Sequence, residues 1–220
     1  MLAFVKERIT QMPDWSFENI HSGIVAGVDE AGRGPWAGPV VAGAVVFLNK
    51  DNINPHLLSS LNDSKKLSAK KREWLYELIV DENKKGNLSY GIGLATAQEI
   101  DEINILQATF NAMRRAVDNL SVKPDVALVD GNQTPRPFKC NVQTVIKGDS
   151  LSFSIAGASI VAKVYRDNLM QELAKKYPYY GFEKNAGYGT KAHIEGLKQY
   201  GICDEHRKSY KPIAEILNNI

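Results

Sequence analysis

Residues 23–48 read GIVAGVDEAGRGPWAGPVVAGAVVFL, and this stretch decides the fold that we expect. Its first part is apolar up to Asp29, which is the composition of a buried strand. Glycines and prolines then mark a turn around residues 32–38, and a valine-rich run over residues 40–48 predicts a second strand. The two strands are therefore expected to form a hairpin.

The rest of the chain alternates between predicted strands and predicted helices. Further strands are expected at residues 88–95, 125–129 and 142–146, and helices at residues 68–83, 96–120, 151–177, 190–200 and 212–219. Thr96 and Glu99 form a capping-box pattern at the start of the second helix, which carries one continuous apolar stripe. This order predicts an α/β fold, with a mixed five-stranded sheet flanked by helices and a small C-terminal helical extension.

The composition indicates a globular protein of a reducing compartment. Of the 220 residues, 44% are hydrophobic and 24% are charged, a balance that excludes an intrinsically disordered chain. The two cysteines, Cys140 and Cys203, lie far apart and form neither a disulfide framework nor a zinc-binding pattern. No apolar run suits a signal peptide or a membrane span, so we expect a cytoplasmic protein without a membrane partner.

Four acidic residues follow predicted strands, at positions where a carboxylate is costly to bury. Asp29 and Glu30 end the first strand. Asp130 ends the fourth strand, and Asp149 follows the fifth. If the first and fourth strands are neighbours, Asp29, Glu30 and Asp130 meet at one edge of the sheet. Clustered carboxylates raise one another's pKa unless a cation neutralises them, and oxygen ligands favour Mg²⁺ or Mn²⁺.

Each of these acids also has a purely structural explanation. Asp29 and Glu30 fit a turn, and Asp130 before a glycine can start one. Asp149 can cap the helix that follows it, and Asp63 is interpreted as a turn residue. Position alone therefore leaves a metal site and a set of turn and cap residues as alternatives.

Several motifs follow one another between residues 23 and 212. They are VDEAGRGP at 28–35 with AGPV at 37–40, NDSKKLS at 62–68, LVDG at 128–131, KGD at 147–149, ASIVAKV at 158–164 with RD at 166–167, GYGT at 187–190 with His193, and HRKSY at 206–210. In this order they resemble the motifs of type 2 ribonuclease H. Two positions depart from the family pattern: Trp36 replaces a smaller aliphatic residue, and Gly157 replaces the usual alanine.

The resemblance implies a ribonuclease H-like fold and a specific reaction. The family hydrolyses the phosphodiester on the 5′ side of a ribonucleotide and leaves 5′-phosphate and 3′-hydroxyl ends. The expected partners are RNA/DNA hybrids and DNA duplexes with single ribonucleotides, in ribonucleotide excision and RNA primer removal. The family pattern makes Asp29, Glu30, Asp130 and Asp149 the ligands of two divalent ions, Mn²⁺ or Mg²⁺, that assist an in-line displacement. We expect a monomer.

The resemblance also assigns residues that contact the substrate. The main chain of Gly32-Arg33-Gly34 is expected to read the 2′-hydroxyl, because glycine lets the main chain approach the sugar closely. Tyr188 is expected to pack on the next deoxyribose and to hydrogen-bond the 2′-hydroxyl; the alternative is an aromatic residue that only packs in a glycine turn. The residues expected to contact phosphates are Lys65, Ser159, Lys163 and Arg207.

The same resemblance divides the chain into three parts. We expect an N-terminal extension at residues 1–22, a ribonuclease H-like catalytic core at residues 23–180, and a C-terminal helical extension at residues 181–220 that packs on the core.

Two other classes of protein are alternatives. A dinucleotide-binding module would use the glycines of residues 32–38, but a strand containing Pro39 follows them instead of a helix that could hold a pyrophosphate. A non-catalytic nucleic-acid-binding protein would use the basic part of the chain from Lys163 onward, where 10 Lys and Arg residues stand against 7 Asp and Glu. Four acids near a phosphate backbone disfavour pure binding, because without a metal they repel nucleic acid.

Overall fold

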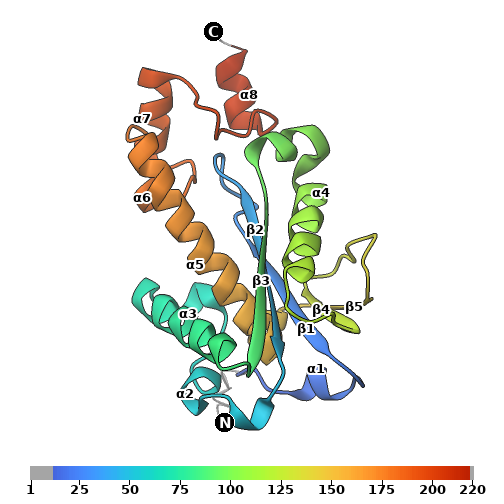
Figure 1. The fold of residues 1–220 in the computed structure, drawn as a ribbon. Helices are drawn as coiled ribbons and strands as arrows, with labels where there is room; N and C mark the ends of the chain where they lie inside the picture. Colours follow the sequence, from blue (N-terminus) through green and yellow to red (C-terminus); the bar gives the residue numbers. More distant parts are fainter. Residues whose placement is uncertain (1–11, 219–220) are drawn as a thin grey trace, which may run out of the picture.

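A five-stranded mixed sheet forms the centre of the protein (Figure 1), as a computed structural model that describes residues 12–218 shows. The strands are β1 (Val25–Ala31), β2 (Val40–Phe47), β3 (Leu88–Ala95), β4 (Val126–Asp130) and β5 (Asn141–Val145). Their order in the sheet is β3-β2-β1-β4-β5. The pairs β1–β2 and β2–β3 are antiparallel, whereas β1–β4 and β4–β5 are parallel. The predicted hairpin and the predicted mixed sheet are therefore confirmed.

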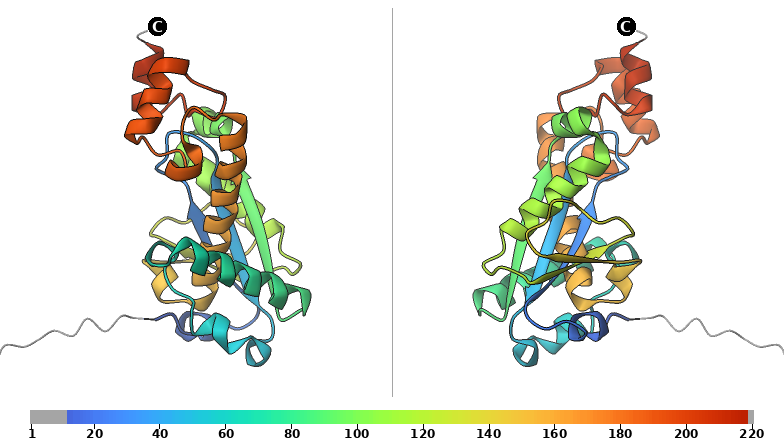
Figure 2. Two further views of the ribbon diagram at one scale, coloured as in Figure 1. Left: turned by 90° about the vertical axis from the view of Figure 1, so that its left-hand side faces the viewer. Right: turned by 90° about the vertical axis from the view of Figure 1, so that its right-hand side faces the viewer.

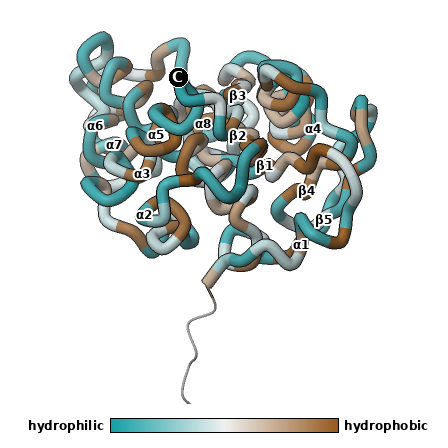
Figure 3. Tube along the Cα trace, turned by 60° about the horizontal axis from the view of Figure 1, so that its bottom comes forward, coloured by the Kyte–Doolittle hydropathy of each residue, from teal (hydrophilic) through white to brown (hydrophobic). Residues whose placement is uncertain are grey.

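Long helices cover both faces of the sheet. Helix α4 (Ala97–Asp118) packs on one face, while α5 (Phe153–Lys176) and α3 (Ala69–Lys84) pack on the other (Figure 1). In Figure 3 the hydrophobic strand segments lie between these two helical layers. The short elements are α1 (Ser16–Asn19), η1 (Lys50–Asn52), α2 (Pro55–Leu58), η2 (Ser64–Lys66) and η3 (Gly148–Ser150). No helix within residues 12–218 is long and apolar enough to cross a membrane.

Three C-terminal helices lie at one end of the sheet, as Figure 2 shows. They are α6 (Phe182–Asn185), α7 (Lys191–Tyr200) and α8 (Lys211–Leu217). A separate small core joins them to the end of α5 and to the turn between β1 and β2, with Ala37, Met170, Phe182, Leu197 and Ile213 among its buried members. The C-terminal segment is thereby held next to the glycine-rich turn.

Glycines in the sheet allow α5 to approach the strands closely. A Cβ on Gly27 would lie 2.1 Å from the main-chain carbon of Ser154, and one on Gly43 would lie 2.4 Å from the carbonyl oxygen of Ala158. No side chain fits in so short a distance, so these two glycines set the separation of helix and sheet. This close packing also brings Ser159 of α5 to the end of β1, next to Asp29.

One predicted helix is interrupted. The capping box of Thr96 and Glu99 is confirmed, with both of its hydrogen bonds present. The expectation of one continuous helix after it is wrong, because Asn104 adopts φ 67° and ψ 162° inside α4. The Asn104 side chain accepts hydrogen bonds from the N–H groups of Leu106 and Gln107, at 3.0 and 3.2 Å, and so caps a new helical start.

Two glycine-to-alanine substitutions test the contact between α5 and the sheet. Gly27→Ala forces a methyl group into the main chain of α5, and we expect it to lower the free energy of unfolding by about 2 kcal/mol or more. Gly157→Ala places its Cβ 3.4 Å from Val45, an ordinary contact. It should raise the free energy of unfolding by about 0.5–1 kcal/mol, because alanine favours helix. Urea unfolding followed by circular dichroism measures the free energy of unfolding of both variants. If the two substitutions changed this free energy equally, the proposed close contact at Gly27 would be wrong.

Candidate active site

The end of β1 lies beside the end of β4 and brings two of the predicted acids together. The parallel register pairs Val28 with Val129, so the next residues, Asp29 and Asp130, are neighbours on adjacent strands. Adjacent strands lie about 4.8 Å apart, and paired residues project to the same face of a sheet. The two carboxylates therefore share one small region at the end of the sheet, as the sequence predicts.

Asp29 is the most deeply buried acid of this group, and its pKa is raised. Its side chain is buried, with 4% exposure. Burial raises the pKa of Asp29 well above its usual range, and repulsion by Glu30 and Asp130 raises it further. Hydrogen bonds from the main-chain N–H of Glu30, at 2.7 Å, and from Ser159 favour the charged form and oppose this rise. A negative charge at Asp29 therefore calls for a nearby cation.

Glu30 faces the glycine turn and belongs to the same charged group. Burial raises the pKa of Glu30, the Arg33 guanidinium lowers it, and the charge of Asp130 raises it. The distance between Arg33 Nη1 and Glu30 Oε1 is 3.4 Å. Arg33 thus connects the turn to the acids through an ion pair.

A hydrogen bond from η3 draws the fourth acid into the site. The N–H of Gly148 donates to Asp130 Oδ1 at 2.7 Å. This contact holds the turn that carries Asp149, whose side chain is only 6% exposed. Burial raises the pKa of Asp149 to about 6, with further contributions from Asp63 and Asp130 and an opposing one from Lys65. All four predicted acids therefore interact with one another in a connected group.

Asp63 is a member of this group that the sequence interpretation missed. Its expected turn role is present, because its carboxylate accepts a hydrogen bond from the N–H of Lys65 at 2.9 Å. Its charge and its hydrogen bond also raise the pKa of Asp149. The sequence could have indicated this role only through the position of Asp63 in the motif NDSKKLS at 62–68, directly before Ser64 and Lys65. A turn explains that position equally well.

Lys65 provides a positive charge in the middle of the acids. Burial opposes the charged form of its amine, but the surrounding carboxylates outweigh burial and the pKa of Lys65 is raised. The contributing acids are Asp29, Asp149, Asp63 and Asp130. Together with Arg33 beside Glu30 and Lys66 at 3.8 Å from Asp63, this ammonium group compensates only part of the negative charge of the acids.

The chemistry of these donors fits a hard divalent cation. Carboxylate oxygens are the ligands that Mg²⁺ and Mn²⁺ prefer. Burial, and after it repulsion between the acids, raises the pKa values of Asp29, Glu30 and Asp149, and a bound cation would favour their charged forms. Across residues 12–218, no three His, Cys, Asp or Glu side chains already stand in a metal-holding arrangement. Binding therefore requires the carboxylates to draw together around the ion.

Arg207 binds the main chain of the glycine turn at residues 32–38. It is fully buried, and it donates from Nε to the carbonyl of Gly38 at 3.0 Å, and from Nη1 and Nη2 to the carbonyls of Arg33 and Gly32 at 2.9 and 2.6 Å. The hydroxyl of Tyr210 also donates to the Arg33 carbonyl. Every guanidinium nitrogen is thus engaged with the main chain. This environment differs from the exposed one that the expected phosphate contact needs, and it makes Arg207 a support of the turn.

Arg166 supports the same turn from α5. It is 2% exposed and donates to the carbonyls of Pro39, Ala186 and Ala37 at 3.0, 3.0 and 3.2 Å. Burial, and after it the nearby charge of Arg207, lowers the pKa of Arg166 to about 10. The guanidinium remains charged at neutral pH, and its role was not expected from the sequence.

Tyr188 lies across the cleft from the glycine turn. Its side chain is 52% exposed, and a Cβ on Gly34 would lie 3.4 Å from its ring. Both residues line a cleft of about 430 Å³. Its lining includes Glu30, Gly32, Arg33, Gly34, Lys65, Lys163 and Tyr188. The fold thus brings most of the predicted substrate contacts to one cleft beside the acids.

Two of the predicted contacts, Ser159 and Lys163, have polar partners within the protein. Ser159 is 3% exposed, and its hydroxyl lies 2.8 Å from that of Ser64, so it supports Asp29 from the interior. Lys163 lines the cleft, with its Nζ 2.6 Å from Asp167. Arg72 lies 3.5 Å from the same carboxylate. Lys163 is thus in reach of a ligand in the cleft, whereas Ser159 is a buried support.

Comparison with known proteins shows which family this chain resembles throughout its length. The family model described as Ribonuclease HII matches residues 26–213. The chain is 54% identical over 201 residues to the Ribonuclease HII of Wolbachia sp. subsp. Brugia malayi (strain TRS), covering 91% of this chain and 94% of that relative. It is 55% identical over 194 residues to the Ribonuclease HII of Endomicrobium trichonymphae, covering 88% of each.

A solved structure has the same fold. The crystal structure of the ribonuclease H2 from Pyrococcus horikoshii OT3 matches with a TM-score of 0.71 and 31% identity, over 89% of this chain and 98% of that one. The predicted ribonuclease H-like fold is therefore confirmed. With its motifs in order, its acids gathered at one end of the sheet and these relatives, the chain belongs to the ribonuclease HII family of endoribonucleases.

Proposed function

We propose that this ribonuclease hydrolyses the phosphodiester on the 5′ side of a ribonucleotide joined to DNA. The observation that carries the proposal is the meeting of Asp29, Glu30, Asp130 and Asp149 beside a firmly held glycine turn. The products are 5′-phosphate and 3′-hydroxyl ends. The substrates are RNA/DNA hybrids and DNA duplexes with single embedded ribonucleotides, which suits ribonucleotide excision and removal of RNA primers.

Divalent cations, Mg²⁺ or Mn²⁺, are the cofactors that these acids fit. Two such ions supply activation of the attacking water and stabilisation of the leaving oxygen when they are bound. A solved structure of Bst-RNase HIII, which shares the fold at 15% identity, was determined in complex with Mn²⁺. That likeness concerns the fold alone, so the case for a metal in this chain rests on its own acids.

The protein orients its acids through fixed hydrogen bonds. Asp130 is held by the N–H of Gly148 at 2.7 Å, and Asp29 by the N–H of Glu30 at 2.7 Å together with Ser159. Each contact limits the rotation of a carboxylate, which would still have to move closer to the other acids when a cation binds. Lys65 sits among the same acids and can approach a phosphate oxygen of the bound strand.

The glycine turn is suited to reading the 2′-hydroxyl. Gly34 carries no side chain beside Tyr188, so a sugar can come close to the main chain there, whereas the missing side chain of Gly32 leaves room for Arg166. Arg207 binds the carbonyls of Gly32 and Arg33, which fixes how the turn faces the cleft. A deoxyribose lacks the hydroxyl that such a turn would bind, and the main-chain groups facing it would then lose their partner.

Tyr188 completes the recognition of the junction between RNA and DNA. Its exposed ring lies over Gly34, where it can pack on the deoxyribose that follows the ribonucleotide while its hydroxyl reaches the 2′-hydroxyl. The exposure favours this role over the packing alternative, because a side chain that only fills a turn is normally buried.

Asp130→Asn tests the acid group directly. The amide keeps an oxygen that can accept from Gly148 but removes the charge, so we expect the protein to fold and to bind a duplex. Nicking of a duplex with one ribonucleotide should fall by more than about 100-fold, since losing an outer partner of a metal ligand already costs 10–100-fold. Chelator should abolish nicking by the unchanged protein. The matched control is Asp81→Asn, which removes an exposed acid of α3 and should leave nicking unchanged. Full nicking activity of Asp130→Asn would show that Asp130 does not belong to the site.

Thermal unfolding tests metal binding independently of activity. With Mn²⁺ at about 100 times its dissociation constant, we expect the Tm to rise by roughly 5–10 °C, because the ion binds only the folded acids. The rise should be smaller at pH 5 than at pH 7, since the raised pKa of Asp149, about 6, makes its carboxyl mostly protonated there. Asp130→Asn should reduce the shift, and an identical shift in that variant would contradict the proposed ligands.

Tyr188→Ala separates junction reading from packing. We expect its kcat/KM at a single embedded ribonucleotide to fall by about 10-fold or more, in line with the loss of one stacking contact. Cleavage of a continuous RNA/DNA hybrid should fall less, because it offers many cleavable bonds. An unchanged rate at the single ribonucleotide would return Tyr188 to a packing role.

A further inference from the structure

Two buried histidines meet behind Tyr188. His193 belongs to α7 and His206 to the segment before α8, and their side chains are 0% and 1% exposed. Their Nε2 atoms lie 2.9 Å apart, which is a hydrogen-bond distance. On its other side His193 places Nδ1 3.0 Å from the carbonyl oxygen of Tyr188. The two rings thus form a continuous chain from the C-terminal segment to the main chain of Tyr188.

The hydrogen-bond partners determine where the protons lie. The N–H of Cys203 donates to His206 Nδ1 at 2.8 Å, so this nitrogen accepts and the neutral ring carries its proton on Nε2. His206 Nε2–H then donates to His193 Nε2, which leaves the His193 proton on Nδ1 to donate to the Tyr188 carbonyl. Burial lowers the pKa of both rings, to about 4 for His206, so the neutral forms prevail at pH 7.

The main chain of Tyr188 is fixed although its ring is exposed. The Tyr188 N–H donates to the carbonyl of Asn185 at 2.9 Å. Its carbonyl accepts from the N–H of Thr190 at 2.8 Å and from His193. Because the backbone has a fixed position on both sides, the direction of the ring over Gly34 depends on these contacts.

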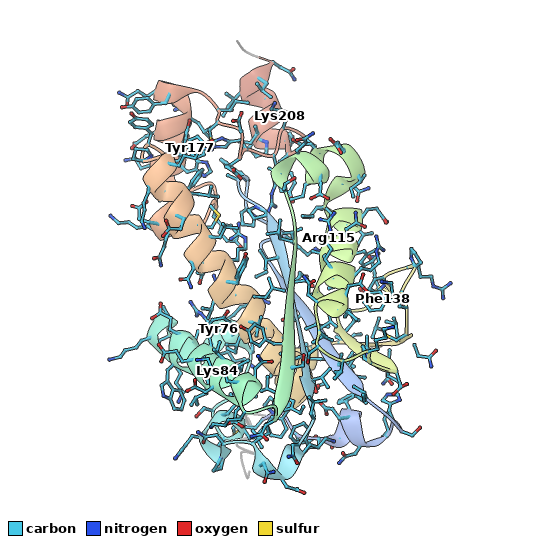
Figure 4. All side chains as sticks on the ribbon, in the orientation of Figure 1. Tyr76, Lys84, Arg115, Phe138, Tyr177 and Lys208 are labelled. Carbon is cyan, nitrogen blue, oxygen red and sulfur yellow. The ribbon has the colours of Figure 1, made fainter. Side chains whose placement is uncertain are left out.

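The C-terminal segment also fixes the opposite wall of the cleft. Next to His206, Arg207 binds the carbonyls of the glycine turn. Further along the chain, Lys208 lies near the N-terminal end of α4 (Figure 4). Its N–H and that of Ser209 donate to Asp101 of this helix at 2.9 and 2.8 Å. One short segment is therefore anchored to α4, binds the glycine turn directly and reaches Tyr188 through His193.

We propose that His193 and His206 are positioning residues that set Tyr188 against the glycine turn and so determine discrimination at a single ribonucleotide. This inference rests on the proposed role of Tyr188 in reading the junction. The histidines touch no substrate; they act through the Tyr188 carbonyl. The segment that carries Arg207 then also sets the distance between the Tyr188 ring and Gly34. Tyr188 and the glycine turn therefore stay at a fixed distance from each other.

Substitutions at His193 test the chain of hydrogen bonds. His193→Phe keeps a ring but removes both polar contacts, whereas His193→Asn keeps a donor near the place of Nδ1. The readout is the ratio of kcat/KM for a single embedded ribonucleotide to kcat/KM for a continuous hybrid. We expect His193→Phe to lower this ratio by about 5-fold to 10-fold, the effect of losing one hydrogen bond. His193→Asn should recover much of it, and His56→Phe, at an exposed histidine, is the matched control.

A double substitution decides whether His193 acts through Tyr188. If it does, His193→Phe with Tyr188→Ala should lower the ratio no further than Tyr188→Ala alone. Effects that multiply, or a ratio unchanged by His193→Phe, would overturn the inference. A ratio unchanged by Tyr188→Ala would instead reject the proposed role of Tyr188. Should His193→Phe not fold, His206→Asn takes its place, because its Oδ1 still accepts from Cys203 while the link to His193 is lost.

Discussion

The parallel pairing of β1 with β4 is the constraint on which the rest of the structure depends. It sets Asp29 beside Asp130, so two carboxylates occupy neighbouring positions where burial makes negative charge unfavourable. The surrounding contacts reduce this cost without removing it: hydrogen bonds from Ser159 and from the N–H of Glu30 favour the charged form of Asp29, and Lys65 adds a positive charge. The cost of burying these carboxylates side by side is what leads us to propose a cation site here.

A second constraint acts on the opposite side of the cleft, where positive charges are buried. Arg166 and Arg207 are satisfied by main-chain carbonyls of the turn between β1 and β2. Such a turn has many carbonyl groups without partners of its own, so two guanidinium groups both meet that need and make the turn rigid. The acids then lie beside a turn of fixed shape. Arg207, which holds this turn, belongs to the C-terminal segment that also carries His206.

Particular residues show how far sequence reasoning reaches. The capping box at Thr96 and the strand that ends in Asp130 were predictable, because caps and strand ends depend on neighbours in the sequence. The break at Asn104 was not, since an apolar stripe continues across it and hides the change of backbone direction. Asp63 was interpreted as a turn residue, which it is, but its contact with Asp149 depends on the packing of the neighbouring Ser64 against Ser159 of α5.

The sequence by itself determined the family and the mixed sheet, because the order of the motifs and the hydrophobic pattern can be read directly along the chain. It also predicted four acids, and the fold brings these close together. Only the tertiary structure decided what each side chain faces. Arg207 is a basic residue in a quoted motif, and whether it meets a phosphate or a carbonyl depends on the turn 174 residues earlier in the chain. The same holds for the contact of His193 with His206, because burial and direction arise when distant segments pack together.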